Sequence, residues 1–141
     1  MNVALETIKE PTLLRYFRTL NAGDFTETAK LFAKEGVMYP PIDPAMIGAA
    51  EITAYLQKEA QGIKAEPQQI VSENLADNHL QIKVTGKAHT SWCIVNVMWL
   101  FILNPKREIL EAKIKLLASP QDLIALRPPH QEYTELPELN H

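Results

Sequence analysis

The sequence predicts an α+β domain in which helices gather on one face of a curved antiparallel sheet. Apolar residues recur at helical spacing from Pro11 to about Gln61, and at every second position from about Pro67 onwards. Two helices, a short strand, a third helix and then a run of long strands form an order typical of such folds. The length of 141 residues corresponds to one domain.

The first helix is predicted to begin at Pro11 and to end at the segment 21–23. Proline is favoured in the first turn of a helix, and glycine is favoured just after the last turn. Apolar residues spaced three and four apart form one stripe that faces the core: Leu13, Tyr16, Phe17 and Leu20.

A second helix is predicted from Asp24 to about Lys34. Asp24 is expected to cap it, with Glu27 as the reciprocal partner of a capping box. Gly36 would end this helix, and a short strand at residues 37–39 would follow.

The third helix is predicted from Ala49 to about Gln61, after a loop held by prolines. Gly62 is its natural stop. One side of this helix carries the core residues Ile52, Tyr55, Leu56 and Ala60.

Strands are predicted at residues 67–74, 79–90, 93–103 and 109–117, with turns at 77–78 and 104–107. In the strand at 79–90 apolar and polar residues alternate. The last strand directs Glu111, Lys113 and Lys115 to one face, together with Ile109. The strand at 93–103 is apolar on both faces, and Asn96 is its only strongly polar residue.

The domain is predicted to span residues 11–126, and a short helix is expected from Ser119 to Ala125. Residues 1–10 would form an N-terminal arm, and residues 127–141 a flexible acidic tail.

Bulk composition argues against several classes of function. The net charge of −3, without a basic stripe, argues against nucleic acid as a partner. The longest apolar run is about half as long as a membrane-spanning helix needs. The first ten residues lack the pattern of a signal peptide, and one cysteine cannot form an internal disulfide. These features favour a cytoplasmic protein.

Residues suited to catalysis or metal binding do not occur at suitable spacings. No pair of histidines has the spacing of metal ligands, and the chain has neither a nucleophile elbow nor a glycine-rich phosphate loop. Asp43 and Glu59 are the only acids that can be placed near a cavity mouth. We therefore expect no enzymatic activity.

Tyr16 and Trp99 are polar-tipped residues in apolar surroundings. Each could simply belong to the core, with its donor bonded to a backbone carbonyl. Two donors that reach one cavity would instead suit a carbonyl on a long apolar ligand. Two other functions stay open: a small isomerase or hydrolase, with Tyr16 as oxyanion donor and Asp43 as base, and an oligomerisation domain with a filled cavity.

The chain resembles a known family over nearly its whole length, from Pro11 to Leu126. The segments that carry the resemblance are "YFRTLNAGDF", "LFAKEGVMYPPI", "QIKVTGKAHTSW", "FILNP" and "LLASPQDL". They are similar to the C-terminal domain of the cyanobacterial orange carotenoid protein, which has a cone-shaped nuclear-transport-factor-two-like fold around an apolar cavity. The family's helical half does not occur in this sequence. The resemblance therefore implies a stand-alone homologue that carries carotenoid in photoprotection.

The resemblance also implies roles for individual residues. The two hydrogen-bond donors to the keto oxygen of the carotenoid fall on Tyr16 and Trp99. The tunnel wall would include Leu20, Ile63, Thr90 and, less directly, Cys93 and Met98. Trp92 and Glu59 match positions that meet the helical half, so they are candidate contacts to a partner.

Cys93 departs from the family pattern, because an aromatic residue usually follows the first tryptophan. The segment between Trp92 and Trp99 is also several residues shorter than in the family. Cys93 could join two monomers through a disulfide and so place pigment uptake under redox control. The alternative is an inert, buried thiol.

The resemblance implies a ketocarotenoid of the canthaxanthin or echinenone type as the bound chromophore. Such a pigment is about 30 Å long, comparable to the core of a bilayer, so one small cone cannot cover it. We therefore expect a homodimer that shares one carotenoid. The source would be the thylakoid membrane, with transient contact at its surface, and the acceptor would be a homologue of the helical half. Oxygen quenching by the bound pigment is a secondary expectation.

Overall fold

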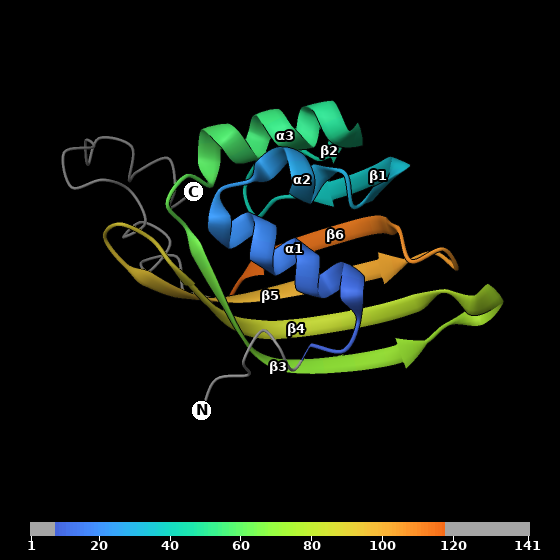
Figure 1. Ribbon diagram of the computed structural model, residues 1–141. Helices are drawn as coiled ribbons and strands as arrows, with labels where there is room; N and C mark the ends of the chain where they lie inside the picture. Colours follow the sequence, from blue (N-terminus) through green and yellow to red (C-terminus); the bar gives the residue numbers. More distant parts are fainter. Residues whose placement is uncertain (1–7, 118–141) are drawn as a thin grey trace, which may run out of the picture.

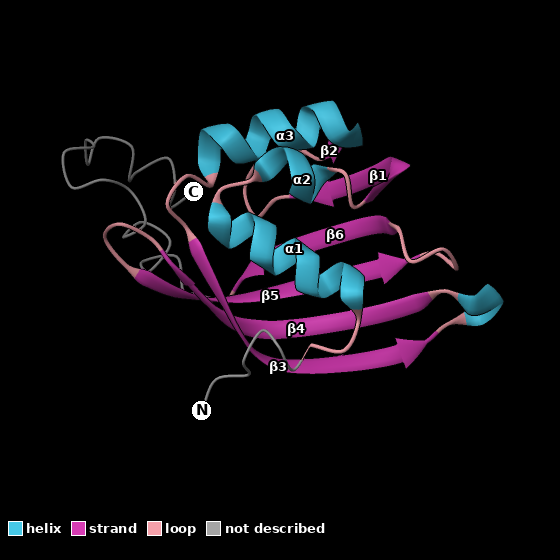
Figure 2. Ribbon diagram, viewed as in Figure 1, coloured by secondary structure: helices cyan, strands magenta, loops and turns pink. Residues whose placement is uncertain are grey.

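The computed structural model describes residues 8–117 of the protein (Figure 1). Three helices lie over one face of a six-stranded sheet (Figure 2). The helices are α1 (Pro11–Ala22), α2 (Phe25–Ala29) and α3 (Gly48–Glu59). The strands are β1 (Phe32–Tyr39), β2 (Met46–Ile47), β3 (Lys64–Asn74), β4 (Leu80–His89), β5 (Ile94–Leu103) and β6 (Ile109–Leu116).

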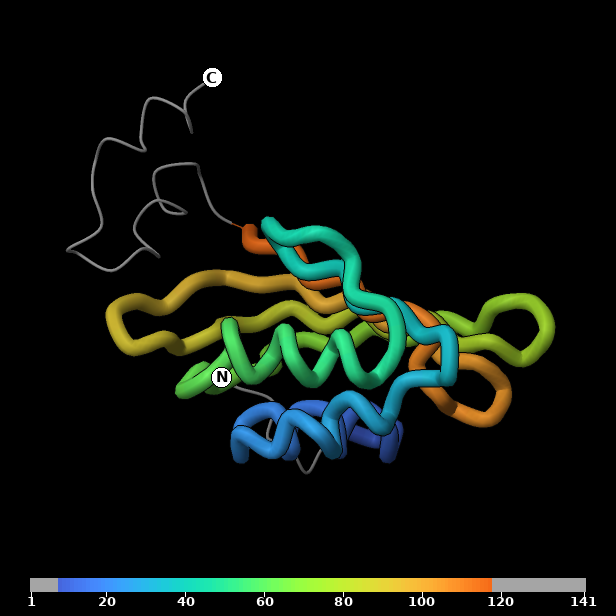
Figure 3. The backbone as a smooth tube through the Cα atoms, turned by 90° about the horizontal axis from the view of Figure 1, so that it is seen from above, coloured from blue at the N-terminus to red at the C-terminus, as the bar shows by residue number. Residues whose placement is uncertain are grey.

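The predicted α+β class with helices on one face is confirmed, but the sheet is mixed rather than wholly antiparallel. Its strand order is β2-β1-β6-β5-β4-β3, and β1 runs parallel to β6. The tube view shows α1 and α3 on the same side of the strands (Figure 3). The predicted helix at 119–125 and the tail at 127–141 lie outside the described residues, as does most of the N-terminal arm.

Helix α1 has the predicted bounds, and its ends are capped. The Glu10 side chain accepts a hydrogen bond from the Thr12 amide at 3.2 Å. Gly23 ends the helix in the left-handed region, with φ of 76°, and its N–H bonds to Leu20 O. The whole predicted apolar stripe is buried against the sheet: Leu13, Tyr16, Phe17 and Leu20.

The prediction for the second helix is wrong beyond Ala29, because residues 32–39 form strand β1. The Asp24 side chain makes no capping hydrogen bond, so the predicted capping box is absent. Gly36 does not end a helix but lies where β1 meets β6: a Cβ there would be 2.6 Å from Ile109 O. Pairing with a strand more than 70 positions away overrides the local helical pattern.

The β3–β4 hairpin turns where the sequence predicts, at Asp77 and Asn78, which have φ of 60° and 62°. Strand β3 starts three residues earlier than predicted and continues through Pro67, where its register with β4 shifts. Gly86 faces this irregularity. A Cβ on Gly86 would be 2.1 Å from Glu66 O, so only glycine lets the two backbones approach.

The apolar strand β5 presents two unequal faces. Its burial alternates, and the buried set is Val95, Val97, Trp99, Phe101 and Leu103. These side chains point towards the helices, as period-two geometry requires. The strand begins at Ile94, and residues 90–93 form the preceding turn.

Strand β6 has one departure from its predicted faces. Ile109 is fully buried, although the sequence pattern groups it with the charged residues. The pairing of β5 with β6 shifts register between Ile102 and Leu103, and this irregularity turns Ile109 inwards. Ala112 is buried on the predicted apolar face. Within residues 8–117, no helix is long and apolar enough to cross a membrane.

Candidate ligand pocket

An apolar pocket of about 230 Å³ lies between the helices and the inner face of the sheet. Its wall is formed by side chains from α1, α3, β3, β4, β5 and β6 and from the loops after β1, α3 and β4. The inner face of the sheet supplies Ala88, Val95, Val97, Ile114 and Leu116. Most of the wall is aliphatic, so the pocket suits an apolar ligand with few polar groups.

Tyr16 and Trp99 both line this pocket, one from α1 and the other from β5. Tyr16 is fully buried and Trp99 is 4% exposed. Phe17 lies between them, with its ring 5.2 Å from that of Tyr16 and 5.1 Å from that of Trp99, each in an edge-to-face contact. Phe101 packs on Tyr16 at 4.9 Å. This aromatic cluster holds both polar side chains in fixed orientations.

Both of these lining residues carry a hydrogen-bond donor, the Tyr16 hydroxyl and the Trp99 indole N–H. Within residues 8–117, no side-chain hydrogen bond involves Tyr16 Oη or Trp99 Nε1. Over the same range, no fully enclosed side-chain nitrogen or oxygen lacks a partner. Since both residues line the same pocket, their donors are the candidates to bind an acceptor placed there.

The phenols of the pocket stay protonated at neutral pH. Burial raises the pKa of Tyr16 well above its ordinary value, and the nearby Tyr55 raises it further. The pKa of Tyr55 is also raised, first by burial and then by the Asp43 carboxylate, with a smaller effect of Glu59. Both groups therefore act as neutral hydroxyls, and Tyr16 can donate a hydrogen bond to a carbonyl.

Several residues predicted for the tunnel wall lie together in this pocket. Leu20, Ile63 and Thr90 line it alongside Tyr16 and Trp99. Glu59, predicted as a partner contact, also lies on the pocket wall, and its side chain is exposed. Asp43 lines the pocket from the proline-held loop.

Met98 does not line the pocket, because it lies on the opposite face of β5 from Trp99. Adjacent residues of a strand point to opposite faces, so the two cannot share one wall. Cys93 is partly buried and packs against the core next to the pocket without lining it. Trp92 is 47% exposed, which leaves its indole accessible to a partner.

Sequence reasoning did not assign Tyr55 to the site. Its place on the core side of the third helix was predicted, but a position on the apolar stripe does not distinguish a core tyrosine from a pocket tyrosine. Asp43 lines the same pocket from an irregular loop, and no periodic pattern in the sequence predicts that the two residues meet there.

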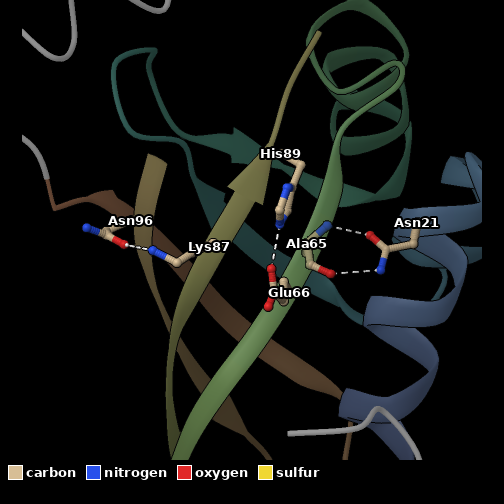
Figure 4. Close-up of polar contacts among 6 residues, drawn as sticks. All are labelled: Asn21, Ala65, Glu66, Lys87, His89 and Asn96. Carbon is tan, nitrogen blue, oxygen red and sulfur yellow. Dashed lines mark hydrogen bonds and ion pairs between the residues drawn. The ribbon is translucent and has the colours of Figure 1, made fainter. Parts of the chain in front are cut away.

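At the edge of the pocket, a side chain of α1 forms hydrogen bonds with the backbone of β3 (Figure 4). Asn21 Nδ2 donates to Ala65 O at 2.9 Å, and Ala65 N donates to Asn21 Oδ1 at 2.7 Å. These bonds join the end of α1 to the edge strand β3, beside the pocket residues Leu20 and Ala65. One residue further along β3, Glu66 pairs with His89 of β4 at 2.5 Å. These contacts connect the end of α1, β3 and β4 at this edge of the pocket wall.

No group of three or more metal-ligating side chains occurs within the described range 8–117. The polar groups of the pocket are hydroxyls, carboxylates and one indole N–H. This donor and acceptor set supports binding of a neutral ligand through hydrogen bonds.

The chain is similar to known proteins in sequence and in fold. The model of the SnoaL-like domain family matches residues 13–101. The orange carotenoid-binding protein of Limnospira maxima is 38% identical over 128 residues, which cover 88% of this chain and 40% of that protein. The orange carotenoid protein of Anabaena (Nostoc), solved with canthaxanthin, superposes with a TM-score of 0.76 at 38% identity, covering 88% of this chain and 41% of that one.

The chain thus spans about 40% of the length of the relatives that it matches. A more distant structure, an NTF2-like protein from Cytophaga hutchinsonii, shares 14% identity and has a TM-score of 0.65. It covers 88% of this chain and 97% of its own length, so the likeness extends over the whole of that fold.

The burial of Tyr16 leads to a testable dependence of stability on pH. Below about pH 10 this phenol is protonated in both the folded and the unfolded chain. Above that value the unfolded chain loses the proton while the folded chain keeps it, so stability falls as pH rises. We expect the free energy of unfolding to fall between pH 9 and pH 11 by about 1 kcal/mol more in the natural chain than in Tyr16→Phe.

Denaturant unfolding at several pH values measures this difference. The control is Tyr39→Phe, because the Tyr39 phenol is 37% exposed and lies outside the pocket. Tyr39→Phe should follow the natural chain. Equal slopes for the natural chain and Tyr16→Phe would contradict the burial of the Tyr16 hydroxyl.

Proposed function

The chain belongs to the SnoaL-like domain family as a homologue of the C-terminal domain of the orange carotenoid protein, and we propose that it is a carotenoid carrier. Residues 11–126 would be the carotenoid-binding domain. One observation carries the proposal: two buried residues with hydrogen-bond donors, Tyr16 and Trp99, line a single apolar pocket. The Anabaena relative was solved with canthaxanthin, which bears a carbonyl on each end ring.

The keto oxygen of one end ring accepts hydrogen bonds from Tyr16 and Trp99 in this proposal. Each bond would contribute about 0.5–1.5 kcal/mol. The larger part of the affinity would come from burial of the ring and its methyl groups against aliphatic side chains, at about 25 cal/mol for each Å². A ligand without a carbonyl would leave both donors unpaired and would therefore bind more weakly.

The pocket of about 230 Å³ is small for a whole carotenoid. Pockets that enclose a drug-sized ligand have volumes of about 300–1,000 Å³, and a carotenoid is about 30 Å long, comparable to a bilayer core. One monomer would therefore hold one end. A second copy that holds the other end would shield the whole pigment from water, which gives a physical reason for a homodimer.

Release of the pigment follows from the same contacts. No covalent bond holds it, so a partner that buries the polyene more completely can take it. The acceptor would be a helical carotenoid protein, for which the exposed Trp92 and Glu59 are candidate contacts. The carrier would work in the cytoplasm and take up carotenoid at the thylakoid surface. The bound pigment would also quench reactive oxygen.

Cys93 offers a site for redox control. Its thiol is partly buried, 3.4 Å from Thr90 Oγ1, and Thr90 lines the pocket. A disulfide between the Cys93 residues of two monomers would fix the turn beside the pocket and so change the uptake of pigment.

A second candidate function is a small isomerase or hydrolase. Asp43 lines the same pocket as Tyr16, so a base and an oxyanion donor would face one substrate. Stable retention of a pigment, without conversion, would favour the carrier.

Pigment binding can be tested by producing the chain in a host that makes ketocarotenoids. We expect the purified protein to be coloured. The double variant Tyr16→Phe, Trp99→Phe loses both donors, and we expect it to retain about a tenth or less of the pigment, in line with two lost hydrogen bonds. Absorbance at the pigment band relative to that at 280 nm measures the retention, after correction for the missing tryptophan.

The matched control is Tyr39→Phe, Trp92→Phe, which removes the same two groups from exposed residues outside the pocket. It should bind as much pigment as the natural chain. A colourless natural chain, or equal colour in both double variants, would refute the assignment of Tyr16 and Trp99.

The role of Cys93 can be tested by non-reducing electrophoresis of protein treated with a mild oxidant. Because the chain has one cysteine, any disulfide-linked species must join two chains through Cys93. We expect a dimer band that disappears with reductant and is absent in Cys93→Ser. A monomer band that does not shift would leave Cys93 as an inert thiol.

A further inference from the structure

Exposed apolar side chains gather at one end of the molecule, beside the pocket. The loop after β1, the end of α3, the β4–β5 turn and the end of β6 lie together at this end (Figure 1, Figure 3). These segments supply the exposed wall residues of the pocket: Pro41, Ile42, Asp43 and Glu59. Together with the start of β5, they also carry four of the seven exposed large apolar residues within 8–117. We call these four the apolar rim: Ile42, Trp92, Ile94 and Leu117.

Backbone hydrogen bonds hold parts of the rim in place. Thr90 N donates to Cys93 O at 2.8 Å, and Thr90 Oγ1 accepts from Cys93 N at 3.0 Å. Trp92 therefore lies in a closed turn between two strands. Leu117 N donates to Asn96 O at 2.8 Å, which places Leu117 beside the start of β5. The exposed side chains of the rim are thus presented by ordered backbone.

The opposite end of the strands is polar. None of the seven exposed apolar residues of the described range lies in the two turns there, at 75–79 and 104–108. A depression of about 270 Å³ between these turns is lined chiefly by polar side chains: Asn74, Asn78, His79 and Arg107. The molecule is therefore apolar at the pocket end and polar at the other. A cluster of exposed apolar residues on one surface is typical of a site that contacts a protein or a membrane.

The charges near the rim indicate what kind of surface fits it. The charged residues of the pocket wall are two exposed acids, Asp43 and Glu59. Four lysines lie near the same end, each on a different helix or strand: Lys58, Lys64, Lys87 and Lys115. Two of them already donate to neutral acceptors, Lys64 to Asn21 O and Lys87 to Asn96 Oδ1. An anionic membrane is bound by clusters of basic residues, whereas this end carries both signs, with the acids at the pocket. An uncharged surface fits it better.

We propose that the apolar rim docks the pocket against an electrically neutral lipid bilayer, with its side chains in the interfacial region. Tryptophan favours that region, because its ring is apolar while its N–H can still form a hydrogen bond. A pigment ring that passes from the bilayer into the pocket beneath this rim stays out of water, so the transfer avoids hydration of its apolar surface. The inference rests on the proposed function, since it names the surface from which the carrier would load.

Vesicle flotation tests the proposal. The natural chain, purified without pigment, is mixed with phosphatidylcholine vesicles, and the bound fraction is measured after centrifugation in a density gradient. The variant Ile94→Ser, Leu117→Ser changes two rim residues that do not line the pocket. We expect its partition onto the vesicles to fall about tenfold, the effect of two aliphatic side chains that are partly removed from water.

The matched control is Ile47→Ser, Val71→Ser, which changes two similarly exposed aliphatic residues. The pairing of the strands places both level with residues 100–102 of β5, away from the rim. This variant should float like the natural chain. Uptake of canthaxanthin from the same vesicles should be slower in the rim variant alone, whereas both variants should take up as much pigment from detergent micelles as the natural chain does.

A natural chain that does not float, or that floats only when phosphatidylglycerol is added to the vesicles, would overturn the proposal. So would an equal loss of flotation in both double variants. A rim variant that still floats but has altered self-association would assign this surface to a second copy of the chain, which also overturns the proposal. Pigment uptake from micelles without vesicle binding would leave the proposed function intact, whereas uptake from neither source would overturn that function as well.

Discussion

The arrangement of the pocket depends on the edge-to-face packing of Phe17 between Tyr16 and Trp99. This contact joins a helix to a strand and fixes two hydrogen-bond donors on the wall of one cavity. A donor kept from water without a partner costs about 1–3 kcal/mol. The closely packed aromatic cluster holds both residues on the wall of the pocket. A ligand carbonyl would then meet donors already in place, at little further cost in ordering.

The sheet supports this arrangement by its two unequal faces. Strand β5 directs Val95, Val97 and Trp99 to the pocket and the alternate residues outwards, so nearly continuous apolar sequence serves both surfaces. The close approach of β3 to β4 at Gly86, and the Asn21 bonds to Ala65, hold the open edge of this wall. Strands thus form one wall of the cavity, while the loop of Asp43 and the end of α3 contribute to the rest of its lining.

Local patterns in the sequence were sufficient to predict α1, α3, β4 and the turn at 77–78. In these segments the apolar spacing and the residues at the ends and turns all indicate the same structure. They failed at residues 32–34, since the start of β1 pairs with the distant β6. The family resemblance was sufficient to predict Tyr16 and Trp99 as site residues. The contacts of Phe17 with both rings could not be predicted, because Trp99 is far from Tyr16 and Phe17 in sequence. Met98 lies on the opposite face of β5 from Trp99, and the resemblance alone does not give the parity of the strand. Tyr55 and Asp43 reach the same pocket from a helix and from an irregular loop, and no periodicity in the sequence reveals this.

The central claim is that Trp99 donates to the ligand carbonyl, and the indole N–H resonances of the chain measure this directly. The chain has two tryptophans, so two indole signals are present, one from the buried Trp99 and one from the half-exposed Trp92. In ¹⁵N-labelled protein loaded with canthaxanthin, the Trp99 signal should move downfield and exchange more slowly with water than in the pigment-free protein. Unchanged Trp99 and a shift confined to Trp92 would contradict the claim and would place the pigment outside this pocket.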